Sequence, residues 1–191
     1  MIFPPLILIL TLLGSMVNIP LVTVKGPETV AGQVISYFGM QVRLPGGHTP
    51  RNTVLAVNVG GALIPAALSL YLFMGITDKI GISWGLLAVL AIVTLVMYRL
   101  ARPVKSLGIA VPGLVPPLLA ALGAWLLCPS AFRAPCAYIA STMGTLIGAD
   151  LLNLQEITKM GAPVASIGGA GTFDGIFLTG VLAVLLAPVG T

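Results

Sequence analysis

Residues 146–154 read LIGADLLNL and residues 169–180 read GAGTFDGIFLTG, so each stretch places one aspartate in otherwise apolar sequence. Apart from Asp150 and Asp174, both stretches have the composition of membrane-spanning helices. If the two helices are antiparallel neighbours joined by a short connection, both aspartates lie at the same end. We therefore expect the two carboxyl groups to lie close together.

The composition of the whole chain predicts an integral membrane protein. Of the 191 residues, 58% are hydrophobic and 7% are charged, and the mean hydropathy is +1.09. A soluble domain has about 25% charged residues, so the lipid bilayer is the expected partner. The basic residues form no stripe or tail, which argues against nucleic acid. No His or Cys cluster has metal-ligand spacing, and no cofactor is expected.

Six segments approach the roughly 20 apolar residues that a spanning helix needs. They predict one all-α transmembrane domain over residues 1–191, a bundle of about six helices, with a short extended element on the cytoplasmic side. The expected spans are 2–24, 52–75, 81–101, 108–128, 134–154 and 172–189.

The basic residues predict the orientation of these spans. One side collects seven of them, and the other side collects only Lys79 and Arg133. Because Lys and Arg accumulate on the inner side, the first side should be cytoplasmic, with both termini on the non-cytoplasmic side of the cell membrane. The seven are Lys25, Arg43, Arg51, Arg99, Arg102, Lys105 and Lys159.

The cytoplasmic connection 25–51 contains an alternation of apolar and polar residues. Within QVISYFGMQVRLPGG, the even positions from Val34 to Leu44 are apolar except Ser36. A period of two is typical of a strand, here half of a hairpin at the inner membrane surface. An extended substrate could add to the edge of such a strand.

Each aspartate has two explanations. Asp174 begins a helix, where unpaired backbone N–H groups favour a carboxylate, so it could simply cap that helix. Asp150 lies in the last turns of its helix, where the dipole disfavours an anion, and could be a solvated helix end. An ionisable residue inside a span otherwise indicates function. Gly144 and Gly148 form a small-residue face that suits packing against one neighbour while Asp150 faces another.

As a pair, Asp150 and Asp174 predict aspartic-protease chemistry. Two adjacent carboxylates cannot both ionise cheaply, so they share one proton. One then activates water as a base while the other polarises a peptide carbonyl as an acid. In this scheme Gly171 shapes the start of the second helix, and Asn153 or Thr172 donates a hydrogen bond to a carboxylate.

Two family resemblances support parts of this interpretation. The stretches NVGGALIPAALSLYL, GTLIGADLLNL and IGGAGTFDGIFLTGVLAVLLA resemble an uncharacterised prokaryotic membrane family, domain of unknown function 1614, over most of the chain. That resemblance implies no activity.

The shorter stretch GTFDGIFLTGVL resembles the second catalytic segment, Gly-x-Gly-Asp, of presenilin-type intramembrane aspartyl proteases. Gly171 and Asp174 match this segment, whereas Phe173 replaces its second glycine, and Ala149 replaces the tyrosine that precedes the first aspartate. The resemblance implies a transmembrane or membrane-proximal peptide as substrate.

The second span suggests a different class of function. Asn58, Gly60, Gly61 and Pro65 could break the helix and free backbone groups to bind an ion, as in a small ion- or proton-coupled transporter or channel. The same residues could instead form a packed kink, with Asn58 bonded across helices. A non-catalytic membrane scaffold is the third alternative.

Cys128 and Cys136 flank the outer loop between the fourth and fifth spans. An oxidising compartment would permit a disulfide between them. Two free thiols at helix ends remain the alternative.

Overall fold

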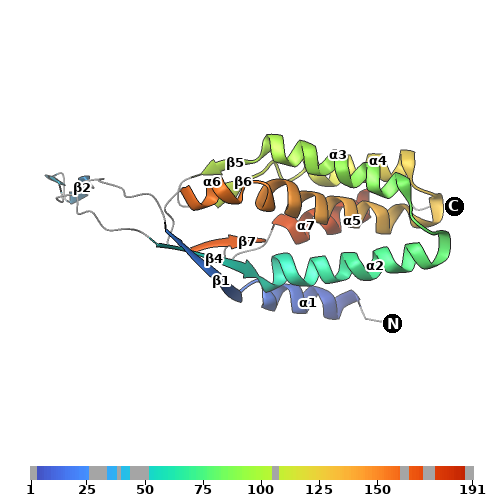
Figure 1. The fold of residues 1–191 in the computed structure, drawn as a ribbon, viewed down its shortest axis with the longest axis horizontal. Coiled ribbons are helices and arrows are strands. Elements are labelled where there is room, and N and C mark those ends of the chain that lie inside the picture. Colours follow the sequence, from blue (N-terminus) through green and yellow to red (C-terminus); the bar gives the residue numbers. More distant parts are fainter. Residues whose placement is uncertain are drawn as a thin grey trace.

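The computed structural model describes residues 4–25, 34–37, 40–43, 52–104, 108–159, 164–169 and 175–187. Within them the chain is mostly helical, with a small sheet at one end of the helices (Figure 1). The longer helices are α1 (Pro4–Gly14), α2 (Ile64–Ile80), α3 (Trp84–Leu100), α4 (Val115–Leu127), α5 (Arg133–Thr145) and α7 (Gly175–Leu186). A short helix, α6 (Leu154–Lys159), follows α5.

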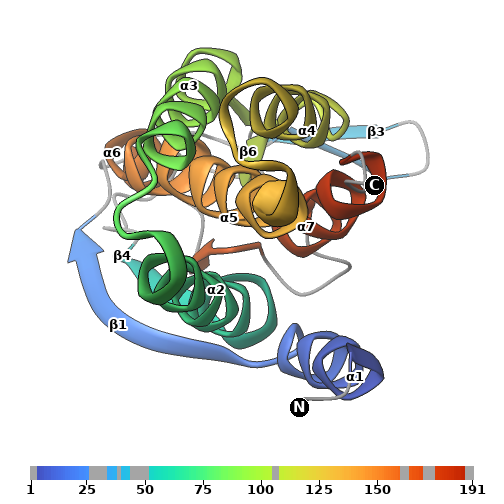
Figure 2. The same cartoon turned by 90° about the vertical axis from the view of Figure 1, so that its right-hand side faces the viewer.

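The long helices lie side by side and alternate in direction (Figure 1). Helix α1 begins and α7 ends at the end of the bundle opposite the sheet. Seen end-on, α5 is surrounded by α2, α3, α4 and α7, whereas α1 lies at the periphery beside α2 (Figure 2). The alternation agrees with the predicted up-and-down order of six helical segments.

Helix α5 occupies the centre because its residues are small enough for close packing. Ala137 and Ala140 are fully buried within it. A Cβ on Gly144 would lie 2.7 Å from Cγ1 of Val93, and a Cβ on Gly148 would lie 2.3 Å from the Thr94 carbonyl oxygen. The predicted glycine face is therefore confirmed as the surface against which α3 packs.

The first predicted span is wrong in its second half. Helix α1 ends at Gly14, and β1 (Asn18–Lys25) follows as a strand. The sequence NIPLVTVK explains the change, because Pro20 cannot continue a helix and the β-branched residues around it favour extended backbone. Pro20 also lacks an N–H, which suits the sheet edge that β1 forms, with a register shift between Pro20 and Val22.

The second predicted span also begins as a strand, β4 (Asn52–Asn58). A π-helical turn, η1 (Val59–Leu63), follows β4 and leads directly into α2. Pro65 is the second residue of α2, and because proline has no N–H it donates no hydrogen bond to the preceding turn of the continuous helix Val59–Ile80.

These strands form a three-stranded sheet that the all-α prediction missed. Its order is β1-β4-β7, where β7 is Val164–Ile167. Strand β4 pairs antiparallel with β1 and parallel with β7, with Val57 opposite Ile167. A second small ribbon pairs β5 (Arg102–Val104) with β6 (Gly108–Ala110), and β6 occupies the beginning of the fourth predicted span.

The predicted extended element in residues 33–44 is confirmed as a hairpin. Strand β2 (Val34–Tyr37) pairs antiparallel with β3 (Met40–Arg43). The hairpin lies beyond the three-stranded sheet and away from the helices (Figure 1). It is therefore not the strand that lies next to Asp150.

Within the described residues, one continuous helix, Val59–Ile80, is long and apolar enough to cross a membrane. Three apolar helices are shorter, namely Trp84–Leu100, Val115–Leu127 and Ile176–Leu186. The fifth predicted span is a helix from Arg133 to Leu151, because α5 continues into the π-helical η3 (Leu146–Leu151). The six predicted spans are thus helical in part, with helix ends that differ from the prediction.

Candidate functional site

Asp150 lies in η3, at the end of the central helix and beside the sheet. The N–H of Leu152 donates to the carbonyl of Ile147, five residues earlier, at 2.9 Å. In an unbroken α-helix, Asp150 would be rotated about 140° from Thr145. A π-helical turn rotates less per residue, so it turns Asp150 back toward the face that carries Thr145.

That face of α5 carries buried hydroxyl groups and packs against α7. The Ser141 hydroxyl donates to the Thr179 carbonyl of α7 at 3.0 Å, and the Thr145 hydroxyl donates to the Ser141 carbonyl at 2.7 Å. Tyr138 and Thr142 are buried on the same face. This row of hydroxyls was missed in the sequence, although its spacing of three and four residues could have revealed it.

The carboxylate of Asp150 is held by the end of β7. The backbone N–H of Gly168 donates to Oδ2 of Asp150 at 2.7 Å. Gly168 has a φ of 83°, in the left-handed region that favours glycine. A Cβ there would also lie 2.7 Å from the backbone nitrogen of Ala62 in η1. Only glycine fits between Asp150 and η1 in this conformation.

A small apolar cluster joins the four elements around this contact. Ala62 of η1, Leu146 of η3, Ile167 of β7 and Ile176 of α7 are buried together. Ile176 at the beginning of α7 and Leu146, four residues before Asp150, thus belong to one buried cluster. Asp174, Gly171 and Thr172 lie outside the described residues, so their predicted roles and the separation of the two carboxyl groups remain predictions.

Asn153 lies within the described residues, and its side-chain amide hydrogen-bonds to backbone carbonyls of the helix that it follows. Its Nδ2 donates to the carbonyl oxygens of Gly148 and Ala149, at 3.0 and 3.1 Å. Both carbonyls belong to the last turns of the helix, where carbonyl oxygens otherwise lack hydrogen-bond donors. The described contacts thus make Asn153 a cap for η3, and its predicted bond to a carboxylate is untested.

The alternative polar site is centred on Asn58, which is 1% exposed. Its Nδ2 donates to the Ser15 carbonyl at 2.7 Å and to Asn18 Oδ1 at 3.1 Å. Its Oδ1 accepts the N–H of Gly61 at 2.7 Å and so caps the start of η1. Ser166 of β7 also donates to Asn18 Oδ1, at 2.5 Å. Asn58 therefore bonds across elements, as the packed-kink alternative predicted.

Gly60 permits the close approach of η1 and α1. A Cβ on Gly60 would lie 2.0 Å from the Thr11 carbonyl oxygen and 2.3 Å from the Ser15 nitrogen. Both contacts are with backbone atoms that cannot move independently. Gly60 therefore has a packing role, which again agrees with the packed-kink alternative.

The two sites that the sequence left as separate alternatives lie together. Gly168 contacts Asp150 on one side and the Gly61–Ala62 segment on the other. The sequence contained a signal for this, since Asn58-Val59-Gly60-Gly61-Ala62 is followed 108 positions later by Ser166-Ile167-Gly168-Gly169-Ala170. The two segments begin in the last residues of β4 and β7, which are paired parallel neighbours.

Cys128 and Cys136 lie at the opposite end of the bundle. Both are buried in the main apolar core and are present as free thiols. The two thiols lie close enough to share a hydrogen bond. Whether they can form a disulfide in an oxidising compartment remains a prediction.

Among the described residues, no group of three or more His, Cys, Asp or Glu side chains could hold a metal ion.

The sequence model of one protein family matches residues 12–186. That family is described as protein of unknown function (DUF1614). No curated protein and no solved structure matches the chain.

Proposed function

The chain belongs to the DUF1614 family, and on that premise we propose that it is a membrane-embedded aspartyl peptidase. Asp150 and Asp174 form its catalytic pair at the cytoplasmic end of the bundle, and its substrate is a transmembrane or membrane-proximal peptide. Six helical segments cross the cell membrane, and both termini lie on the non-cytoplasmic side.

The surface of the helices supports the membrane part of this proposal. Large apolar side chains face outward along several helices, including Leu70 on α2, Leu126 on α4 and Leu185 on α7, which are 60%, 63% and 74% exposed. Contiguous apolar surface of this kind favours contact with lipid. The helices shorter than about 20 residues would be accommodated by local thinning of the bilayer.

The distribution of charge supports the orientation. Among the described residues, five basic ones belong to elements at or beyond the end of the bundle that carries the sheet (Figure 1): Lys25 in β1, Arg43 in β3, Arg99 in the last turn of α3, Arg102 in β5 and Lys159 in α6. Lys79 lies in the last turn of α2 and Arg133 begins α5, and these helix ends are at the opposite end of the bundle (Figure 1). The positive-inside rule then makes the sheet end cytoplasmic, which is also the end that carries Asp150.

The main support for the catalytic proposal is the hydrogen bond from the backbone N–H of Gly168 to the carboxylate of Asp150. The Gly168 N–H holds Oδ2 of Asp150 at 2.7 Å, and the π-helical turn directs this residue toward the face of α5 that packs on α7. Asp174 immediately precedes Gly175, the first residue of α7, and Ile176 belongs to the same buried cluster as Leu146 of η3. These contacts favour a short separation between the two carboxyl groups.

The pair would hydrolyse a peptide bond with one shared proton. The ionised carboxylate removes a proton from water, whose oxygen adds to the peptide carbonyl carbon. The protonated carboxyl group donates its proton to the carbonyl oxygen. Collapse of the tetrahedral intermediate breaks the C–N bond, and the amine leaves with a proton returned by the pair. Such roles require carboxylates whose environments differ.

The peptide substrate is proposed to bind along strand β7, next to the catalytic pair of aspartates. In the described part of the sheet β7 is an edge strand, because β4 pairs with it on one side only. An extended peptide can add to such an edge through backbone hydrogen bonds. Since β7 leads directly to Gly168, this edge replaces the hairpin of residues 34–43 as the proposed substrate-binding strand.

The test compares Asp150→Asn and Asp174→Asn with Asp78→Asn, an exposed aspartate at the far end of α2. The purified full chain is reconstituted in vesicles with a mixture of synthetic transmembrane-segment peptides, and products are identified by mass spectrometry. We expect cleavage by the unaltered chain and by Asp78→Asn, and a loss of about 10²-fold or more in either catalytic variant. Cleavage that survives either substitution rules out the pair.

A proton- or cation-coupled transporter is the second candidate, favoured by the hydroxyl row of α5. Tyr138, Thr142, Thr145 and Thr179 are all buried inside the bundle, and intramembrane polar groups line ion pathways in transporters. Vesicles that contain a pH-sensitive dye test this function. A proton flux that Thr142→Val reduces, without any peptide cleavage, would favour the transporter. If Asp150→Asn alters neither flux nor cleavage, the scaffold alternative gains support.

A further inference from the structure

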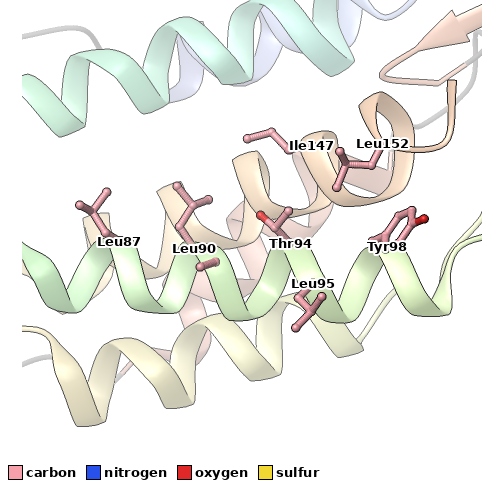
Figure 3. A pocket seen from close by; sticks show the side chains of 8 residues that line it. Leu87, Leu90, Thr94, Leu95, Tyr98, Ile147 and Leu152 are labelled. Carbon is pink, nitrogen blue, oxygen red and sulfur yellow. The ribbon is translucent and has the colours of Figure 1, made fainter.

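An apolar groove runs along the surface between α3 and η3. It encloses about 400 Å³, and its walls include Leu87, Leu90 and Tyr98 of α3 and Ile147 and Leu152 from the end of the central helix. Figure 3 shows Leu87, Leu90, Thr94 and Tyr98 on the side of α3 that faces Ile147 and Leu152, whereas Leu95 points to the other side of the helix. The groove lies on the side of η3 that meets α3, whereas Asp150 bonds to Gly168 of β7. It is therefore separate from the proposed catalytic pair.

The length of the groove matches the depth of one membrane leaflet. From Leu87 to Tyr98, α3 rises by about 16 Å. Half of a hydrocarbon core about 30 Å thick is about 15 Å. The groove is thus long enough to hold one acyl chain of a single leaflet, lying along α3.

The arginines near the groove lie at one end of it, whereas Thr94 is a polar residue in its middle. Tyr98 forms that end, and tyrosine is a side chain that accumulates at the membrane–water interface. Arg99 lies one helical turn beyond Leu95, which also lines the groove, and Arg102 follows in β5. Both arginines are exposed. Guanidinium groups bind phosphate through paired hydrogen bonds.

We infer that this groove holds one acyl chain of an anionic phospholipid from the cytoplasmic leaflet, with its phosphate bound by Arg99 and Arg102. The charge at one end and the apolar walls along the rest match the two parts of that lipid. The inference rests on the proposed membrane location and orientation, but not on the proposed hydrolysis.

The test uses the purified full chain in a mild detergent. It is incubated with equal amounts of phosphatidylglycerol and phosphatidylcholine that carry the same acyl chains, and retained lipid is counted by native mass spectrometry. We expect one phosphatidylglycerol per chain, retained about tenfold more often than phosphatidylcholine. Arg99→Gln together with Arg102→Gln should remove the preference, whereas Lys79→Gln at the opposite end should keep it.

Two matched pairs of variants test the groove itself. Ala91→Phe fills the groove, whereas Ala88→Phe adds the same bulk to an exposed position of α3 outside it. Leu152→Ala trims one wall, whereas Leu151→Ala trims an exposed neighbour. We expect about tenfold less retained lipid for Ala91→Phe and about threefold less for Leu152→Ala, with both controls unchanged.

Three results would overturn the inference. The unaltered chain could retain the two lipids equally, or the groove variants and their controls could lose the same amount of lipid. The third result is a dimer mass that Ala91→Phe abolishes, because a second copy of the chain would then occupy the groove. Should Ala91→Phe fail to fold, the Leu152→Ala and Leu151→Ala pair decides alone. Asp150→Asn should retain lipid normally, so failure of the peptidase proposal and failure of the lipid site are distinguishable.

Discussion

The segments at the ends of β4 and β7 have closely similar sequences but different roles. The segment Asn58-Val59-Gly60-Gly61-Ala62 begins at the last residue of β4, and Ser166-Ile167-Gly168-Gly169-Ala170 begins within β7, its parallel neighbour. Along the chain, α2 comes after the first segment and α7 after the second, and both helices run away from the sheet (Figure 1). The two segments match in sequence but not in sheet register, because Ser166 pairs with Ala56 and not with Asn58.

In the first segment the polar groups bond to one another and to neighbouring backbone. Asn58 is buried, caps η1 through Gly61 and bonds to Ser15 and Asn18. In the second segment Ser166 is only half-buried, and the N–H of Gly168 is directed at the carboxylate of Asp150. The difference indicates that the first segment stabilises the fold, whereas the second positions an ionisable group. Substitutions at residues that match in sequence between the two segments can test whether the first stabilises the fold and the second positions Asp150.

Gly60→Ala should have the largest effect. The new Cβ would lie 2.0 Å from a backbone oxygen of α1, and overpacking against rigid backbone costs about 3 kcal/mol or more. We expect little folded protein, measured as the monodisperse fraction in detergent and by thermal unfolding. Gly75→Ala is the control, because nothing lies within 4 Å of its Cβ, and it should be neutral or stabilising by up to about 1 kcal/mol. Normal folding of Gly60→Ala would contradict the packing role.

Gly168→Ala should come next and should affect activity more than folding. An alanine at a φ of 83° is strained by about 1–2 kcal/mol, and its Cβ would press on Ala62 of η1. We expect the free energy of unfolding to fall by about 2–3 kcal/mol. Because the N–H that holds Asp150 would shift, peptide cleavage per folded molecule should fall as well. Unchanged cleavage in the folded fraction would show that this bond does not position the carboxylate.

Asn58→Ala should destabilise the protein by about 2 kcal/mol, because the buried N–H of Gly61 and the carbonyl of Ser15 lose the side chain that hydrogen-bonds to them. Thermal unfolding measures the loss. Cleavage per folded molecule should stay unchanged, in contrast to Gly168→Ala. If Asn58→Ala abolishes an ion flux while the fold is kept, the first segment is a functional site and the division fails.

Ser166→Ala should have the smallest effect, below about 1 kcal/mol, because its hydroxyl bond to Asn18 is solvent-accessible. Combining Ser166→Ala with Asn58→Ala measures the coupling through Asn18, whose Oδ1 accepts from both residues. We expect a coupling energy of at least about 0.5 kcal/mol. Strict additivity would mean that the two segments are energetically independent.

Local sequence predicted some parts of the molecule well. The apolar segments predicted most of the helices and their alternating order, and the alternation in residues 33–44 predicted the β2–β3 hairpin. The sequence also singled out Asp150 and Asn58. It misassigned residues 18–25 and 52–58, because hydropathy averaged over a window of about 20 residues does not distinguish a helix from an apolar strand that runs into one.

The amino-acid sequence by itself determined that this chain would bury apolar surface in helices, where glycines would allow close packing, and which few ionisable groups the apolar segments would contain. Those properties depend on composition and on spacing within one segment. Only the tertiary structure decided that Gly168 would hold Asp150 and that Asn18 would join β4 to β7. Such contacts connect residues far apart in the chain, so they exist only once β1, β4 and β7 have paired and α5 has taken the centre of the bundle.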